Sequence, residues 1–300
     1  MSAPGMELED EGGNGTALSH WKRRNAKDEL MSGISGVGYY TALTMAVFVD
    51  MGFYQAQWGM AEPMAWGNNS GCELLTQKCL TNGVSKYPEM FCGTEIKHYT
   101  CTSDRLALGH CTIYTYQNPL PAQFRYFADP QLGGSSGNLM DYCPYIQPYT
   151  NSRCIDGSAD LMHGSRVGPK SKCLKGEGLR DPKGSLGDVC AEVSCDNDRV
   201  NVRYLGDDTW HACPEGGSIA PDGFFTSGKI LCPRHIEVCP QLQKEEDGHS
   251  GDKSHSGEDT KPAERIPPPY LPYDISRLHN VLFPIVSTTL FFVVAIVAAC

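Results

Sequence analysis

The sequence lacks an excess of basic residues, and this argues against a nucleic-acid partner. Its 300 residues hold 25 Lys and Arg against 35 Asp and Glu, a formal net charge of −10. Phosphate backbones are bound by basic faces, so this balance fits an acidic, extracellular surface instead. No C-x-x-C pair, P-loop or dinucleotide-binding glycine pattern occurs. A zinc ribbon, a thioredoxin-like site and a nucleotide-dependent enzyme are therefore disfavoured.

Residues 1–30 also lack the apolar stretch of a secretory signal peptide. Yet 13 of the 14 cysteines lie between Cys72 and Cys239, a density typical of exported, disulfide-bonded proteins. We therefore expect the chain to begin within a longer protein. Because 13 is odd, one cysteine of this block is expected to be free or to pair outside it. Cys300 ends an apolar tail and is a poor partner for it.

One long helix is expected, over residues 35–51, where apolar residues recur at i, i+3 and i+4. Ser35 can cap it, and Gly52 stands where a glycine often ends a helix. From Trp58 to Cys239 no helical period persists, and short apolar runs alternate with Gly, Pro, Asn and Asp. This pattern predicts β and irregular structure stabilised by disulfides, each contributing about 2–4 kcal/mol.

The C-terminal composition predicts attachment to a membrane. Residues 241–280 are polar, charged and Pro-rich, as expected of a disordered stalk. Residues 281–300 are nearly all apolar and long enough to span a bilayer as a helix. A transmembrane anchor and a GPI-attachment signal both remain open. N-glycosylation triplets begin at Asn14 and Asn68, which suits a cell-surface protein.

Ser19-His20 lies in a loop and leads through Asp28-Glu29-Leu30-Met31 to the expected helix. This pattern resembles the leishmanolysin family, the cell-surface zinc proteases of the metzincin group. The resemblance extends over residues 19–239. Further matching stretches are Arg24-Asn25-Ala26, Gly38-Tyr39-Tyr40-Thr41-Ala42-Leu43-Thr44-Met45-Ala46, Asp50-Met51-Gly52-Phe53-Tyr54, Trp66-Gly67-Asn68, Gly71-Cys72, Met90-Phe91-Cys92, Tyr126-Phe127 and Met140-Asp141-Tyr142-Cys143-Pro144.

The resemblance implies an α+β fold in two parts. Residues 1–60 would be the remnant of the metzincin C-terminal catalytic subdomain, and residues 61–240 a disulfide-rich, mostly β and irregular domain. His20 would be the third zinc ligand, and Met31 the methionine of the Met-turn beneath the zinc-binding histidines. Without the resemblance, His20 would be read as a solvated loop histidine and Met31 as a packing residue. The implied cofactor is zinc, and the implied partners are protein or peptide substrates and host proteins.

The catalytic motif of this family is missing. Two zinc ligands and the general base should come from an HExxH helix. None of the nine histidines is followed by Glu, and no two are four residues apart. We therefore predict that the chain has no catalytic glutamate and is inactive by itself, so that its assignment as an enzyme rests on the family alone.

The resemblance also implies a disulfide pattern. In the family, the cysteine that matches Cys72 pairs with one upstream of the third histidine. No cysteine precedes His20 here, so Cys72 is predicted to be a free thiol. The implied pairs are Cys79–Cys143, Cys92–Cys111, Cys101–Cys173, Cys154–Cys190, Cys195–Cys239 and Cys213–Cys232.

Three functions stay open. The first is a partial copy of a leishmanolysin-type zinc metalloendopeptidase, with proteolysis and cell adhesion as family roles. The second is a non-catalytic, cysteine-rich surface protein that serves in adhesion or as a decoy. The third, an unrelated disulfide-rich receptor ectodomain, is disfavoured by the resemblance. All three are expected at the cell surface, anchored in the membrane.

Overall fold

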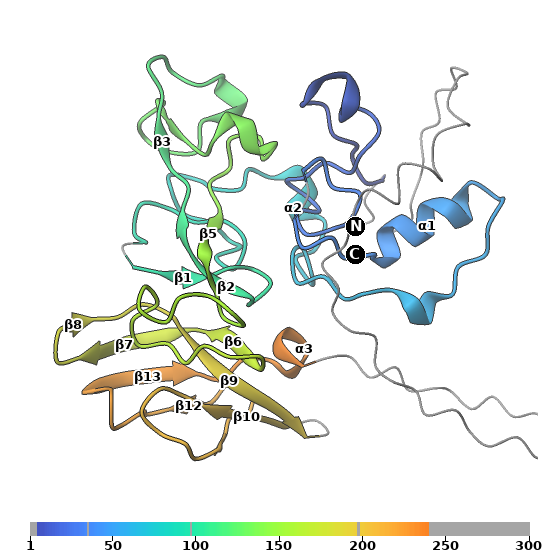
Figure 1. Cartoon of the computed structure of the whole chain (residues 1–300). Helices are drawn as coiled ribbons and strands as arrows, with labels where there is room; N and C mark the ends of the chain where they lie inside the picture. Colours follow the sequence, from blue (N-terminus) through green and yellow to red (C-terminus); the bar gives the residue numbers. More distant parts are fainter. Residues whose placement is uncertain (1–4, 35, 97, 197–198, 240–300) are drawn as a thin grey trace, which may run out of the picture. The chain divides into compact units, whose positions relative to one another are not determined.

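Strands and irregular segments dominate the computed structural model, and its helices are few and short. The structure describes residues 5–34, 36–96, 98–196 and 199–239 (Figure 1), and these belong to one compact unit. The expected fold class, with a disulfide-rich and mostly β or irregular body, is confirmed.

The expected stalk at 241–280 and the apolar segment at 281–300 lie outside the described residues. Within the described residues, no helix has both the length and the apolar character needed to cross a bilayer. The membrane anchor and the domain boundaries at residues 60, 240 and 280 stay predictions.

The longest helix, α1 (Ala42–Asp50), begins later than the sequence pattern indicates. Ser35 lies outside the described residues, and the helix is capped by Thr41, whose Oγ1 accepts a hydrogen bond from Leu43 N at 3.2 Å. The prediction of a helix from residue 35 is therefore wrong over its first turns.

Pairing with a distant segment explains the late start of α1. Tyr39 N donates to Asp28 O at 2.9 Å, and Leu30 N donates to Tyr39 O at 2.8 Å. Tyr39 is thus bridged to Glu29 in a parallel arrangement that excludes helical geometry. The C-terminal end was predicted correctly: Gly52 has a φ of 76° and donates its N–H to Val49 O at 2.9 Å.

The strands form antiparallel sheets, labelled in Figure 1. The first sheet has the order β1-β2-β5, with bounds Thr100–Cys101, Ala107–Cys111 and Ile146–Arg153. The second has the order β11-β10-β9-β6, with bounds His211–Ala212, Arg199–Arg203, Val189–Asp196 and Ser171–Leu174. The third has the order β12-β13-β7-β8, with bounds Ser218–Ile219, Ser227–Leu231, Gly176–Asp181 and Gly184–Ser185. A two-stranded ribbon pairs β3 with β4, with bounds Tyr114–Thr115 and Leu132–Gly133.

The other helices of the described residues are single turns. The two α-helical turns are α2 (Glu73–Thr76) and α3 (His235–Val238). The 3₁₀ turns are Gly13–Gly15, Trp58–Met60, Ala122–Phe124 and Ser136–Asn138.

The second and third sheets share one hydrophobic core. Strand β10 alternates buried and part-exposed residues, and Val202 is fully buried. Leu174 on β6 and Val189 on β9 face the same cluster as Ile230 on β13, each with 0% exposure. Burying a side chain of this size contributes about 1.5–3 kcal/mol, so this core carries much of the stability of the C-terminal strands.

Six disulfides cross-link the described residues. Cys101–Cys173 joins β1 to β6, and Cys195–Cys239 joins β9 to the residue after α3. These six are the same pairs that the family resemblance implies: Cys79–Cys143, Cys92–Cys111, Cys101–Cys173, Cys154–Cys190, Cys195–Cys239 and Cys213–Cys232.

The prediction of a free thiol at Cys72 is wrong. Cys72 is disulfide-bonded, and none of the cysteines between Cys72 and Cys239 is free. The prediction sought its partner upstream of His20 and set aside Cys300, which lies outside the described residues.

A carboxylate organises the turn between β10 and β11. Asp207 accepts a hydrogen bond from Thr209 N at 2.7 Å and contacts His211 Nε2 at 2.7 Å. The His211 ring stacks on Tyr204, with ring centroids 5.1 Å apart. The Thr209 N–H, followed by the His211 ring, lowers the pKa of Asp207 to about 2.

The lowered pKa of Asp207 predicts that the protein loses stability in acid. The pKa of Asp207 is about 2 in the folded state and about 3.9 in an unfolded chain. Its stabilising contribution is therefore complete above the unfolded value and is lost as the pH falls toward the folded one. Asp207→Asn should lower the thermal midpoint near neutral pH. The difference in thermal midpoint between this variant and wild type should narrow as the pH falls from about 4 to about 2.

Circular dichroism melts across this pH range measure the gap. Asp208→Asn is the control, because it leaves both Asp207 contacts intact and removes only an exposed ion pair with Arg166. A gap between Asp207→Asn and wild type that stays constant down to the lowest pH contradicts the assignment.

Candidate metal centre

The segment that carries His20 is held between two others by backbone hydrogen bonds. Glu9 N donates to His20 O at 2.9 Å, and Trp21 N donates to Met31 O at 2.8 Å. Trp21 forms an antiparallel bridge with Leu8 and a parallel bridge with Ser32. The structure therefore places His20 and Met31, eleven positions apart in the sequence, on neighbouring backbone segments.

The His20 ring is oriented through its Nδ1 atom. Nδ1 lies 2.9 Å from Ser19 Oγ and 3.2 Å from Thr16 O. A carbonyl oxygen can only accept, so a hydrogen bond to Thr16 O requires the tautomer with the proton on Nδ1, and in that neutral tautomer Nε2 keeps its lone pair. Metal-binding histidines are commonly held in this way by a carbonyl on the other ring nitrogen. The His20 side chain therefore fits the role of a zinc ligand through Nε2.

A buried carboxylate fixes the turn at Met31. Glu29 has 0% exposure, and its Oε2 accepts a hydrogen bond from Met31 N. Its Oε1 accepts from Thr44 Oγ1 at 2.6 Å, from Thr41 Oγ1 at 3.2 Å and from Thr41 N at 3.4 Å. Burial of a carboxylate is tolerable only with such partners, and here they come from the Met31 turn and from α1.

The same carboxylate is linked to the residue after His20. Trp21 Nε1 donates to Thr44 Oγ1 at 3.0 Å, and that hydroxyl in turn donates to Glu29 Oε1. We call Trp21, Glu29, Met31, Thr41 and Thr44 the Glu29 network. It ties the His20 segment, the Met31 turn and the first turn of α1 into one unit.

A run of basic side chains next to His20 is buried, a feature that the sequence analysis missed. Arg23 and Arg24 are 5% and 6% exposed. Arg23 Nη1 donates to Asn138 O at 2.6 Å, and Arg24 Nη1 donates to Leu74 O at 2.9 Å. These bonds join the His20 region to residues that follow it by 115 and 50 positions. Nothing in the sequence indicated this burial, because a run of basic residues usually lies on a solvated face.

A pair of carboxylates connects the Met31 turn to the first sheet. Asp28 is fully buried, forms an ion pair with Lys27 and accepts a hydrogen bond from Ser103 Oγ at 3.0 Å. Burial, followed by the charge of Asp28, raises the pKa of Asp104, and Lys27 partly opposes this rise. The loop between β1 and β2 is therefore electrostatically coupled to the residues before Met31.

The other predicted site residues lie apart from this centre. Among the described residues, no group of three metal-binding side chains with converging ligand atoms includes His20. Met31 is 36% exposed and is joined to the His20 segment through its backbone. Asn14 and Asn68 are both exposed, as glycosylation requires, and their modification stays a prediction. Of the expected zinc site, the sequence supplies one candidate ligand, His20.

The comparisons with known proteins identify the family of the chain. The family model described as leishmanolysin (peptidase M8) matches residues 2–245. Leishmanolysin of Leishmania major is 40% identical over 260 residues, covering 81% of this chain and 42% of its own length. A leishmanolysin homolog of Crithidia fasciculata is 38% identical, covering 78% of this chain and 38% of its own length. A leishmanolysin-like peptidase of Drosophila pseudoobscura pseudoobscura is 27% identical over 310 residues. The chain spans about two fifths of the length of the curated relatives it matches.

The Glu29 network predicts a large effect of a small substitution. Glu29→Gln places an amide donor where a buried oxygen accepts hydrogen bonds, so the free energy of unfolding should fall by about 1–3 kcal/mol. Glu62→Gln is a matched control, because Glu62 accepts a backbone N–H from Tyr40 at 2.8 Å but is exposed. Its cost should stay within about 0.5 kcal/mol. Urea titrations measure both variants, and equal midpoints would contradict the role given to Glu29.

Proposed function

Since the chain belongs to the leishmanolysin family, we propose that it supplies the C-terminal part of a zinc metalloendopeptidase centre. His20 is its third zinc ligand, and Met31 forms its Met-turn. The observation that carries the proposal is the orientation of the His20 ring, which uses Nδ1 on Thr16 O and keeps the lone pair of Nε2 for a metal.

Each residue of the centre has a role of its own. The carbonyl of Thr16 holds the proton on His20 Nδ1, which sets the tautomer that binds metal. Glu29 and the Trp21–Met31 hydrogen bond fix the distance between the histidine segment and the Met31 turn. Zinc, when bound, supplies an acidified water and polarises a peptide carbonyl. The substrates are then proteins or peptides.

The centre is incomplete in the 300 residues of this sequence. A catalytic zinc takes three protein ligands and one open position. The HExxH motif, which should bring two histidines and the general base, is absent from the sequence. We therefore propose that these residues are inactive alone and become part of a working peptidase when joined to a segment that carries HExxH.

A second candidate is a non-catalytic surface protein for adhesion or as a decoy. It is favoured by the contrast between one remaining zinc ligand and a body that keeps six disulfides and a shared core. Both candidates are proposed to act at the cell surface, held by the apolar residues 281–300.

An activity assay separates the two candidates. The chain alone should hydrolyse no peptide with or without Zn²⁺. A fusion behind the HExxH-bearing part of the Leishmania major relative should hydrolyse peptides in a zinc-dependent manner. His20→Ala should lower the activity of that fusion by more than about 100-fold, because even the outer partners of metal ligands are worth roughly 10–100-fold.

His98→Ala is the control variant, since His98 is exposed and is not a member of the Glu29 network. Full activity of the fusion with His20→Ala contradicts the proposal, as does zinc-dependent hydrolysis by the chain alone. A folded fusion without activity, judged by its circular dichroism spectrum, favours the non-catalytic candidate.

A further inference from the structure

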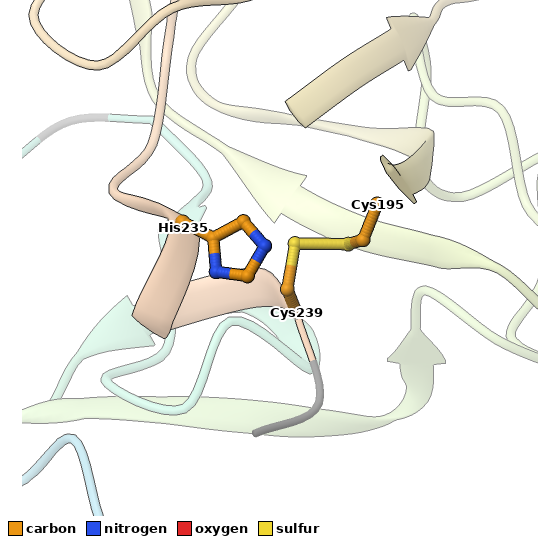
Figure 2. A group of neighbouring side chains, drawn as sticks. All are labelled: Cys195, His235 and Cys239. Atoms are coloured by element: carbon orange, nitrogen blue, oxygen red, sulfur yellow. A yellow bond between two sulfur atoms is a disulfide. The ribbon is translucent and has the colours of Figure 1, made fainter. Parts of the chain in front are cut away.

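Three potential metal ligands converge at the C-terminal end of the disulfide-bonded body. Cys195 lies on β9, His235 is the first residue of α3, and Cys239 follows that helix. Their sulfur and ring nitrogen atoms all lie within 4.8 Å of one another. His235 and Cys239 are four positions apart, the spacing that places two side chains on one face of a helical turn. Figure 2 shows the imidazole of His235 directed at the two sulfur atoms.

One ring nitrogen of His235, Nε2, is buried and makes no hydrogen bond within the described residues. A buried polar atom without a partner costs roughly 1–3 kcal/mol, and most such atoms are satisfied in folded proteins. The sulfurs of Cys195 and Cys239, which lie within 4.8 Å of a ring nitrogen of His235, are joined as a disulfide. A disulfide sulfur is not a thiolate and so is a poor metal ligand.

We propose that reduction of the Cys195–Cys239 disulfide turns this cluster into a binding site for a thiophilic metal ion. Zn²⁺ is the ion that this set of side chains suits. A dithiol reductant gives two electrons and two protons to the disulfide, so that two cysteine thiols form and the reductant becomes a disulfide. Binding of the ion then releases the two thiol protons to solvent. Two thiolates and the imidazole of His235 supply three ligands, and water takes the fourth position.

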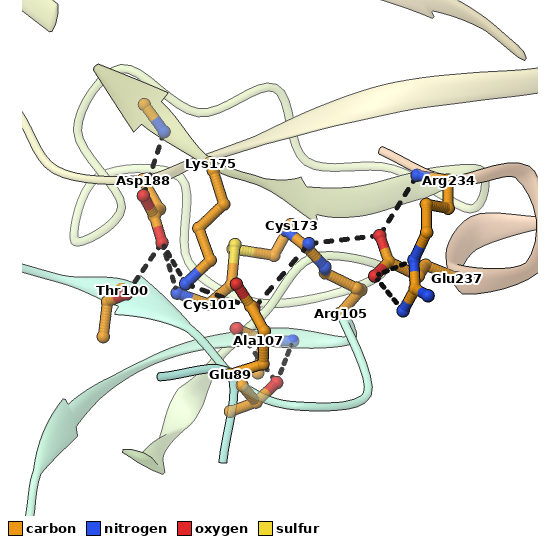
Figure 3. A network of polar contacts seen from close by, with 12 residues as sticks. Glu89, Thr100, Cys101, Arg105, Ala107, Cys173, Lys175, Asp188, Arg234 and Glu237 are labelled. Carbon is orange, nitrogen blue, oxygen red and sulfur yellow. Dashed lines mark hydrogen bonds and ion pairs between the residues drawn. A yellow bond between two sulfur atoms is a disulfide. The ribbon is translucent and has the colours of Figure 1, made fainter. Parts of the chain in front are cut away.

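The helix that carries His235 keeps its place without the disulfide. Arg105 Nη2 pairs with Glu237 Oε2 at 3.2 Å, and Arg234 N donates to the same carboxylate at 3.1 Å. Figure 3 shows Glu237 between these two arginines. Val238 is 5% exposed and belongs to the core shared by the second and third sheets. The Arg234–Glu237 contact stabilises α3 itself, and the Arg105–Glu237 pair and the burial of Val238 hold it against the body, so the ligand atoms stay close together after reduction.

A second group of potential metal ligands is less suited to binding an ion. Cys101, Cys173 and Asp188 also converge, but all three are buried. Asp188 already accepts hydrogen bonds from Thr100 Oγ1 at 2.7 Å, from Cys101 N at 2.8 Å and from Gly176 N at 2.9 Å (Figure 3). Cys195, by contrast, is part-exposed, which favours attack of a small thiol on its disulfide.

Cobalt binding tests the proposal in the full chain, kept in detergent without oxygen. The chain is treated with increasing dithiothreitol, and alkylation with peptide mapping identifies the disulfides that open. Co²⁺ is added as the spectroscopic probe once Cys195 and Cys239 are reduced and the dithiothreitol, which itself binds Co²⁺, has been removed. We expect one Co²⁺ per chain, with thiolate-to-metal charge-transfer absorption that Zn²⁺ displaces. A cobalt ion bound at His20 has no thiolate and lacks this absorption, so the test does not depend on the proposed function.

Two variants assign the nitrogen ligand. His235→Gln should weaken Co²⁺ binding by at least about 10-fold, since changes even outside the ligand set cost roughly 10–100-fold. His110→Gln is the matched control, because His110 Nδ1 is also buried without a partner among the described residues. Its ring packs against Tyr149, with centroids 4.6 Å apart, and it should leave binding unchanged.

A measurement on the wild-type chain needs no variant. Zn²⁺ should slow alkylation of the reduced Cys195 and Cys239 thiols while leaving the other exposed thiols unaffected. The proposal is overturned if the reduced chain gives no charge-transfer absorption, or if His235→Gln binds Co²⁺ as well as wild type. It is also overturned if the native near-ultraviolet circular dichroism is lost before this disulfide opens.

Discussion

The carboxylate of Glu29 lies out of reach of water, and its hydrogen bonds decide how the N-terminal part of this protein is arranged. One oxygen takes the backbone N–H of Met31, and the other takes the hydroxyls of Thr41 and Thr44. Thr44 also receives the indole N–H of Trp21, the residue after His20. A carboxylate in such a position has to be fully satisfied, so the positions of the His20 segment, the Met31 turn and α1 are set together.

Buried charge also connects this unit to the disulfide-bonded body. Arg23 and Arg24 donate to backbone carbonyls far along the chain, and Asp28 accepts from Ser103 at the start of the loop between β1 and β2. Removing one partner of a buried charged pair costs more than removing an exposed pair. The His20 region is therefore an integrated part of the compact unit, and its geometry depends on sheets that themselves depend on disulfides.

The sequence allowed the prediction of features that are local or carried by the resemblance. Gly52 ends α1 as its position indicated, and the six disulfide pairs are those that the resemblance implied. Features that depend on distant partners were missed. The start of α1 is displaced because Tyr39 pairs with the backbone of residues 28–30, and no helical propensity reports such pairing. The burial of Arg23 and Arg24 was hidden for the same reason. The bonded state of Cys72 was missed because the resemblance implied a partner upstream of His20, where the sequence has no cysteine.

Hydrogen exchange at the Trp21 amide tests most directly whether Glu29 organises the candidate centre, since this amide donates to Met31 O. The account predicts strong protection of the Trp21 amide in the wild-type chain and its loss in Glu29→Gln. Amides of the core strand β10, such as that of Val202, should stay protected in both. Equal protection of the Trp21 amide in the two proteins would show that the His20 segment and the Met31 turn hold together without Glu29, and it would contradict the central claim.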